Sequence, residues 1–150
     1  MNKLLESFWK WLNKSPQEYA IYGAGKFVYG RMEDDFPRFE ELLDYAKSIV
    51  DKNILNEEAI DELFTIMALD NESEIILDYI DDFSSEEQLK RIIDIGINHM
   101  HYEGRWQLAE LLYRKRPKNY MEYLLLLSKD GNPCVSKRAS NCISYIAEEG

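Results

Sequence analysis

The sequence predicts an all-α protein built from antiparallel helix pairs, and three observations support this prediction. β-Strand signals are almost absent. Helix start signals recur along the chain, each followed by apolar residues at the helical spacing i, i+3, i+4 and i+7. The turns between the expected helices are short, so successive helices should be antiparallel neighbours. We therefore expect one domain, residues 1–150, in which the pairs stack into a short right-handed α-α superhelix.

An apolar stripe and a capping box predict the first two helices. Leu4, Leu5, Phe8 and Leu12 share one face of a helix expected at about residues 2–13. The second helix begins at the segment Ser15-Pro16-Gln17-Glu18, which combines a capping box with proline at the first helical position. This is the most specific local signal in the chain, and we expect the helix to include Gly23 and Gly25.

Four more helices are expected in the middle of the chain. Their start signals are Asp34-Asp35 with Pro37, Asn56, a box of Asn71 with Glu74, and a box of Ser84 with Glu87. The side chains expected to face inward are Phe39, Leu42, Leu43, Ala46, Ile49, Val50, Ile60, Leu63, Phe64, Met67, Ile75, Ile76, Tyr79, Ile80, Leu89, Ile92, Ile93, Gly96 and Met100.

Three helices complete the chain. They are expected at about residues 103–115, after Pro117, and after the cap Asn132-Pro133. Their inward side chains should be Trp106, Ala109, Leu112, Tyr120, Met121, Leu124, Leu125, Leu127, Val135, Ala139, Cys142, Ile143 and Ile146. The second helices of the pairs then begin near Phe36, Glu72, Gly104 and Cys134.

The charge is concentrated in one block. Residues 31–98 hold twenty Asp and Glu against six Lys and Arg, a net charge of −14, whereas residues 1–30 and 99–150 each carry +2. A one-sided acidic surface would attract and steer a cationic partner. It argues against nucleic acid, whose phosphates require the opposite sign.

No stretch reaches the roughly 18 apolar residues of a membrane span, and the N-terminus does not read as a signal peptide. We therefore expect a cytoplasmic protein with reduced cysteines.

The last third of the chain resembles a HEAT repeat. The segment from Asp130 through Val135, Arg138 and Ala139 is similar to the second half of such a repeat, and residues 105–112 are similar to the same half one unit earlier. A non-repetitive helical array is the alternative. The resemblance implies a curved stack whose second helices line a concave face that binds other macromolecules. Small HEAT-like proteins of this size also occur among bacterial immunity proteins, which block toxin domains.

Two motifs suggest chemistry but have simpler interpretations. The glycines from Gly23 to Gly30 are similar to a dinucleotide-binding loop, but Val28 replaces the third glycine and no βαβ unit follows, so close helix packing is the preferred interpretation. His99 and His101, near Glu103, would point apart on a helix, which favours a turn over a metal site. We identify no catalytic residue, no cofactor site and no metal site, and expect a protein that is not an enzyme.

Two surface features also have alternative interpretations. The basic run Arg114-Lys115-Arg116-Lys118 should interact with helix C-terminal carbonyls and solvent, or with phosphate or the acidic face of another copy. The N-terminal aromatic residues Phe8, Trp9 and Trp11 should cap the open end of the stack rather than enter a membrane.

These observations predict a binding module that captures a basic protein partner, and the preferred class is a toxin-neutralising immunity protein. The alternatives are a scaffold or adaptor, and a nucleic-acid-binding protein that uses the basic C-terminal third. Carboxylates would attract the partner and aromatic side chains would anchor it. The predicted contact residues are Asp34, Asp35, Glu41, Asp44, Tyr45, Asp78, Tyr79, Asp81, Asp82, Tyr102 and Trp106.

Overall fold

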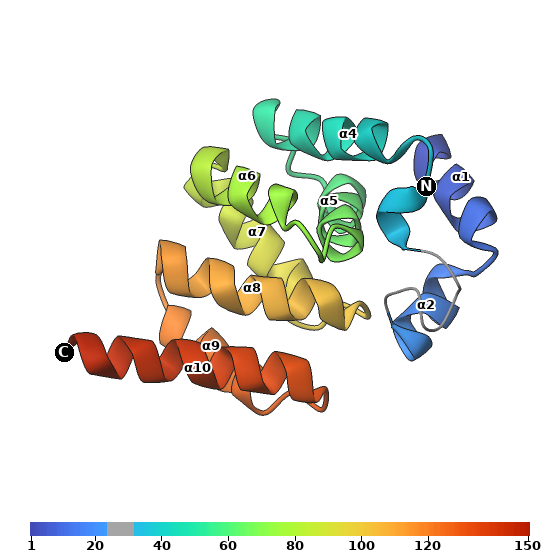
Figure 1. Ribbon diagram of the computed structural model, residues 1–150. Coiled ribbons are helices and arrows are strands. Elements are labelled where there is room, and N and C mark those ends of the chain that lie inside the picture. Colours follow the sequence, from blue (N-terminus) through green and yellow to red (C-terminus); the bar gives the residue numbers. More distant parts are fainter. Residues whose placement is uncertain (24–31) are drawn as a thin grey trace.

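The computed structural model describes residues 1–23 and 32–150, which form α-helices, one 3-10 turn and no β-strand (Figure 1). The all-α prediction is confirmed, and every expected helix has a counterpart. The elements are α1 (Lys3–Leu12), α2 (Pro16–Tyr22), η1 (Glu33–Asp35), α4 (Phe39–Asp51), α5 (Glu57–Leu69), α6 (Ile75–Phe83), α7 (Glu86–Gly96), α8 (Tyr102–Lys115), α9 (Tyr120–Ser128) and α10 (Pro133–Glu149).

From α4 onward the helices alternate between two layers. α4, α6, α8 and α10 lie side by side and run in the same direction, which we call the front layer (Figure 1). α5, α7 and α9 return behind them and form the back layer. The front layer contains the four helices expected to be second members of pairs, so the layering agrees with stacked antiparallel pairs. α4 lies at one end of the stack and α10 with α9 at the other, and α1 and α2 lie along the side where α4 and α8 begin (Figure 1).

Three of the predicted helix starts have the expected cap. The Ser15 hydroxyl accepts the Glu18 N–H, and the Glu18 carboxylate accepts the Ser15 N–H, both at 3.1 Å. The Asn56 side chain accepts the Ala59 N–H at 2.9 Å. Asn132 caps α10 by accepting the N–H groups of residues 134 and 135. Local hydrogen bonding therefore starts these helices where the sequence indicates.

The cap predicted at Asn71 is wrong. α6 begins at Ile75, and the Asp70 carboxylate accepts the Ile76 N–H at 2.9 Å. The Asn71 amide instead donates to the Ala68 carbonyl at 3.0 Å, at the end of the preceding helix. Asp70 provides the capping bond because its side chain is buried in the α5–α6 turn. The dipole of α6 also stabilises a negative charge at the helix N-terminus.

The second incorrect cap is displaced by one residue. The Ser85 hydroxyl, not that of Ser84, accepts the Gln88 N–H at 3.0 Å and starts α7. The N–H of Ser84 belongs to the end of α6, where it donates to the Ile80 carbonyl. Adjacent serines are chemically equivalent as caps, so the end of the preceding helix decides between them.

Gly23 ends α2 rather than continuing it, which corrects the expectation that it lies inside a helix. Its φ is +77°, a backbone conformation that is unfavourable for any residue with a Cβ atom. A Cβ atom here would also overlap the Tyr102 side chain of α8. The expected close approach at Gly23 is therefore present, but at a helix end. Gly25 lies outside the described residues.

Most of the predicted inward residues are buried, with three clear exceptions. Ile75, Met100 and Leu125 are 39 %, 43 % and 47 % exposed. Met100 lies in the turn after α7, so the helical periodicity used to predict its burial does not apply there. Several buried residues were not included in the prediction, among them Ile66, Leu69, Leu77, Leu108 and Leu111.

The aromatic residues of α1 pack inside the protein. Phe8 and Trp9 are buried, and the Phe8 and Trp11 rings lie 5.4 Å and 5.5 Å from the ring of Phe36. The Trp9 ring is also stacked 6.0 Å from His101. α1 therefore covers the side of the stack where α4 and α8 begin (Figure 1), which corrects the expectation that it caps an open end. Phe8 and Trp9 are not exposed for insertion into a bilayer.

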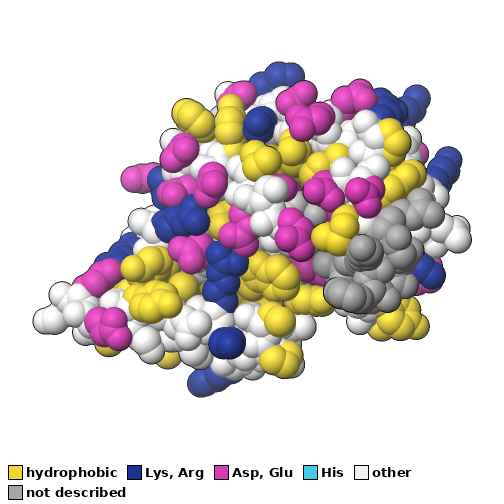
Figure 2. Space-filling model, viewed as in Figure 1, with side chains coloured by type: hydrophobic (Ala, Val, Ile, Leu, Met, Phe, Trp, Pro, Cys, Tyr) yellow, Lys and Arg dark blue, Asp and Glu magenta, His cyan; other side chains and the backbone are white. Residues whose placement is uncertain are grey.

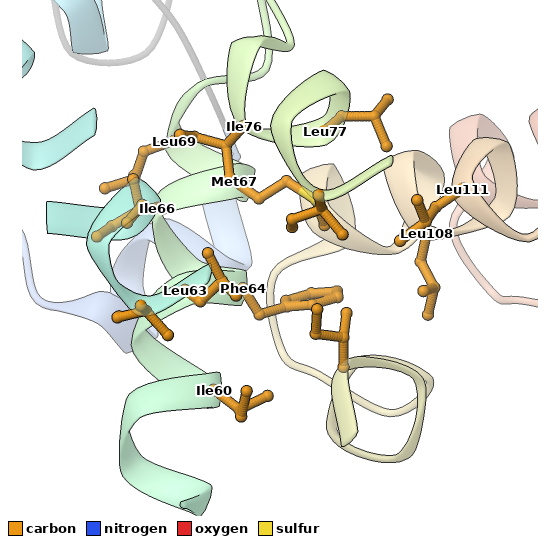
Figure 3. Close-up of a cluster of buried hydrophobic side chains, with 14 of the residues drawn as sticks. Ile60, Leu63, Phe64, Ile66, Met67, Leu69, Ile76, Leu77, Leu108 and Leu111 are labelled. Atoms are coloured by element: carbon orange, nitrogen blue, oxygen red, sulfur yellow. The ribbon is translucent and has the colours of Figure 1, made fainter. Parts of the chain in front are cut away.

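Phe64 of α5 occupies the centre of the core, where α5, α7 and α8 meet (Figure 3). Gly96 of α7 and Gly104 of α8 flank its ring so closely that a Cβ atom at either position would overlap it. The His99 ring lies 4.6 Å from the same ring. The absence of two side chains therefore allows three helices to meet around one phenylalanine.

Replacing Gly104 by Ala should lower the free energy of unfolding by about 2 kcal/mol, because overpacking outweighs the gain in helix propensity. Urea denaturation measures this change. Gly131→Ala is the control, since no atom lies within 4 Å of a Cβ placed there. In a double-mutant cycle, Phe64→Leu should reduce the cost of Gly104→Ala. Additive effects of the two substitutions would contradict direct contact.

Candidate protein-binding face

α6 carries apolar residues on two sides. One side, which includes Ile76 and Ile80, is fully buried. Ile75, Tyr79 and Phe83 follow one another at i, i+4 and i+8 and form a second stripe on another side. Phe83 is 61 % exposed, and its ring centroid lies 4.6 Å from that of partly buried Tyr79. We call these three residues the α6 outer stripe, and it leaves apolar surface facing solvent.

α4 supplies charged groups beside this stripe. The Tyr79 hydroxyl donates a 2.5 Å hydrogen bond to the Asp51 carboxylate, which raises the pKa of Tyr79. The Lys47 ammonium group lies 5.5 Å from the centre of the Tyr79 ring, within range of cation-π attraction. Asp44 lies on the same side of α4 as these two residues, toward its N-terminus. Asp44 and Asp82 are exposed and have no ion-pair partner in the described chain.

Arg114 of α8 draws two of the predicted contact residues into an internal network. Its guanidinium lies 2.8 Å from Asp78 and 3.5 Å from Asp81 of α6, and 3.2 Å from Glu110. Burial disfavours its charge, but the bonds to Asp78 and Glu110 raise the pKa of Arg114 overall. Lys115 adds a 2.9 Å bond to the Asp81 carbonyl. The chain thus partly neutralises Asp78 and Asp81 itself, and their contact with a partner stays a prediction.

A second set of contacts connects α6, α8 and α10. Arg138 of α10 donates to both carboxylate oxygens of Glu74, at 2.8 Å and 3.1 Å. The Trp106 indole donates to Glu74 at 3.4 Å, and its ring lies 5.7 Å from that of Tyr102. Both predicted aromatic anchors are partly buried against the core, so they also support the front layer. Figure 2 shows Lys and Arg side chains among carboxylates over this part of the surface.

The other predicted contact residues have separate surroundings. The Tyr45 hydroxyl donates a 2.7 Å hydrogen bond to Glu62 of α5, and burial together with this bond raises the pKa of Tyr45 to about 12. Glu41 forms an exposed ion pair with Arg38 at 2.8 Å. Asp34-Asp35 lies on the exposed side of η1. Tyr45 therefore bonds inward between α4 and α5, and Asp34 lines a small hollow with Glu72 and Ser73, just before α6.

The acidic residues are distributed over both layers, which corrects the expectation of a one-sided acidic surface. Figure 2 shows carboxylates over α4 and α6 of the front layer. Exposed carboxylates also lie on the back layer, at Glu57 and Glu58 of α5 and at Glu86, Glu87 and Asp94 of α7. The four glutamates occupy the first turns of their helices, where the helix dipole stabilises negative charge. Helix stability therefore accounts for part of the acidity.

The two histidines lie in the turn between α7 and α8, as predicted, and both are buried. His99 Nδ1 accepts the His101 N–H at 3.2 Å, so His99 carries its proton on Nε2 and donates to Asp61 at 2.8 Å. His101 is enclosed by the rings of Trp9 and Tyr19. These contacts give the pair a structural role. Within residues 1–23 and 32–150, no cluster of His, Cys, Asp and Glu is arranged to hold a metal ion.

The basic turn after α8 is largely paired within the chain. Arg116 lies 2.7 Å from Glu149, and Arg114 is bound to α6 as described. A cleft of about 770 Å³ separates this turn from α7, and it is lined by Lys90 and Lys118 but also by glutamates of α7. The arginines that would contact phosphate are therefore already occupied, which disfavours the nucleic-acid alternative.

The residue that sequence reasoning missed is Phe83. We expected Ile75 and Tyr79 to face inward together with Ile76 and Ile80. These four positions occupy a wider arc of the helix surface than one contact with the core can bury. Reading residues 75, 79 and 83 as a separate stripe at i, i+4 and i+8 would have identified it.

No helix in the described ranges is both long enough and apolar enough to cross a bilayer. Comparison with models of protein families, with curated proteins and with solved structures finds no match.

Replacing His101 by Gln should make stability less sensitive to acid. Burial, with a smaller effect of His99, lowers the pKa of His101 to about 3, compared with about 6.5 in an unfolded chain. Between these values the unfolded chain binds a proton that the folded protein excludes, so the free energy of unfolding falls as the pH decreases. The contribution lost between pH 7 and pH 5 is about 2 kcal/mol, measurable by urea denaturation at both pH values.

Asp70→Asn should have the opposite effect. Burial raises the pKa of Asp70 to about 6, above the unfolded value of about 3.9. Here the folded protein binds the extra proton, so Asp70 adds stability as the pH falls from 7 toward 4. Removing this group should enlarge the loss of stability in acid, whereas His101→Gln reduces it. Identical pH dependence in both variants would contradict these assignments.

Proposed function

We propose that this protein is a non-enzymatic binding module that captures a basic protein partner through the front of α4 and α6. The observation that carries the proposal is the α6 outer stripe, in which exposed Phe83 extends from partly buried Tyr79. An exposed aromatic residue such as Phe83, next to a tyrosine that contacts of α4 hold in place, is typical of a residue that anchors an interface. Asp44 and Asp82, which have no partner in the described chain, supply the charge that a basic partner would neutralise.

The supporting contacts keep this face in a fixed arrangement. Asp51 and Lys47 hold the Tyr79 ring from α4, and Arg114 holds Asp78 and Asp81 from α8. A partner therefore meets side chains whose conformations are already restricted, which reduces the entropy lost on binding. Carboxylates near an aromatic anchor also accelerate encounter with a cationic surface.

The biological role that we propose is neutralisation of a toxin domain in the cytoplasm, the role implied by the resemblance to small HEAT-like immunity proteins. Such a gene should lie directly downstream of a gene for a large secreted protein with a variable C-terminal domain. Expressing that domain alone should stop growth, and expressing this chain with it should restore growth. A stable complex that leaves toxicity unchanged would instead indicate a scaffold or adaptor.

Phe83→Ala should weaken this complex about 10- to 100-fold, mainly through faster dissociation, because the central anchor is lost. Surface plasmon resonance with the purified toxin domain measures both rates. Phe83 is largely exposed, so the melting temperature should change little. Unchanged affinity would remove the α6 outer stripe from the interface.

Neutralising Asp44 and Asp82 together to Asn should slow association about 3- to 10-fold at low salt and reduce its dependence on salt. Dissociation should change less. Glu87→Gln combined with Asp94→Asn is the matched control, since it also removes two exposed carboxylates but from α7 in the back layer (Figure 1). If all of these substitutions slowed association equally, overall net charge would explain the effect and not the α4–α6 face.

A further inference from the structure

α9 carries an exposed stripe whose charges have a self-complementary order. Glu122, Leu125 and Leu126 of α9 and Lys129, the residue directly after its last turn, are spaced at i, i+3, i+4 and i+7, so they lie along one side. Leu125 is 47 % and Leu126 is 60 % exposed, and both charged residues are exposed at the ends of the stripe. Neither charge has an ion-pair partner in the described chain. We call these four residues the α9 stripe.

The α9 stripe is symmetric about the point between Leu125 and Leu126. Two copies of α9 packed antiparallel about a two-fold axis through this point place each Glu122 opposite the Lys129 of the other copy. The leucines then meet at the centre, between the two ion pairs. Residues 122 and 129 are about 10 Å apart along the helix, so both ends fit within one short helix–helix contact. A two-fold interface requires this kind of self-complementary patch.

The charge distribution of the whole chain favours a second copy as the occupant. Two copies with net charge −10 repel each other, but residues 99–150 carry +2 and the acidic block ends before them. α9 lies with α10 at the end of the stack opposite α4, and α6 is next to α4 (Figure 1). Approach through α9 therefore keeps α4 and α6 of the two copies apart (Figure 1). Near the contact, the Glu86 and Glu87 carboxylates of α7 share a cleft with Lys90 and Lys118, which reduces their repulsion at a Debye length of about 10 Å in 0.1 M salt.

We propose that the α9 stripe is a homodimer contact in which two α9 helices pack antiparallel. Two leucines from each copy form a small apolar centre, so the dimer is weak, with a dissociation constant of about 100 µM. This contact is distinct from the face formed by α4 and α6, and each can fail without the other.

Charge reversal across the two-fold axis tests this arrangement by sedimentation equilibrium over a series of protein concentrations. Glu122→Lys and Lys129→Glu should each weaken self-association at least tenfold, because like charges then face each other. Mixing the two variants should restore association, since a stripe with a cation at both ends then faces a stripe with a carboxylate at both ends. The double variant with both substitutions should self-associate like the original protein. Glu6→Lys on α1 and Phe83→Ala on α6 are controls that should leave association unchanged.

Three results would overturn the proposal. The original protein could remain monomeric at about five times the expected dissociation constant. The single reversals could leave self-association unchanged. The mixture could fail to associate although each single variant is weakened. Circular dichroism melting of every variant separates these results from misfolding, and all four positions of the α9 stripe are exposed, so the substitutions should fold.

Discussion

The position of Phe64 is the constraint on which the rest of the structure depends. Its ring fits between the α7 and α8 backbones only because Gly96 and Gly104 have no side chains. This contact brings α5, α7 and α8 together and fixes the turn that carries the two histidines. The same turn places His101 against Trp9, so α1, at the side of the stack (Figure 1), is positioned from the same centre. Because side chains in the core are closely packed, a change in the size or position of the Phe64 ring affects every helix that contacts it.

The front layer is held together by long side chains that cross between helices. Arg114 connects α8 to α6, and Arg138 connects α10 to α6 through Glu74. These bonds use carboxylates that would otherwise increase the repulsion within an acidic protein. These arginines do not bind every carboxylate of the front layer. Asp44 and Asp82 have no ion-pair partner within the described chain, and the α6 outer stripe is partly exposed. Surface charge in the described chain therefore divides into carboxylates that pair with Arg114 and Arg138 and carboxylates that have no ion-pair partner.

The candidate site was only partly predictable from the sequence. Asp82 was expected at the surface and is exposed, whereas Tyr79 was expected both to face inward and to contact a partner, and it is partly buried. Phe83 was missed because a single apolar stripe was expected on α6. Tyr45 was assigned to the surface, but its hydroxyl reaches Glu62 on the next helix, and no local pattern reveals a bond across 17 residues.

The sequence by itself determined the all-α class, the order of the helices and most of the inward residues. These properties follow from capping bonds within about four residues and from a repeat of 3.6 residues per turn. Only the tertiary structure decided which helices share a layer, that Asp70 rather than Asn71 starts α6, and that Arg114 neutralises a carboxylate 36 residues away. Such choices depend on groups brought together by core packing, because the energy of a buried or paired charge is set by its neighbours in space.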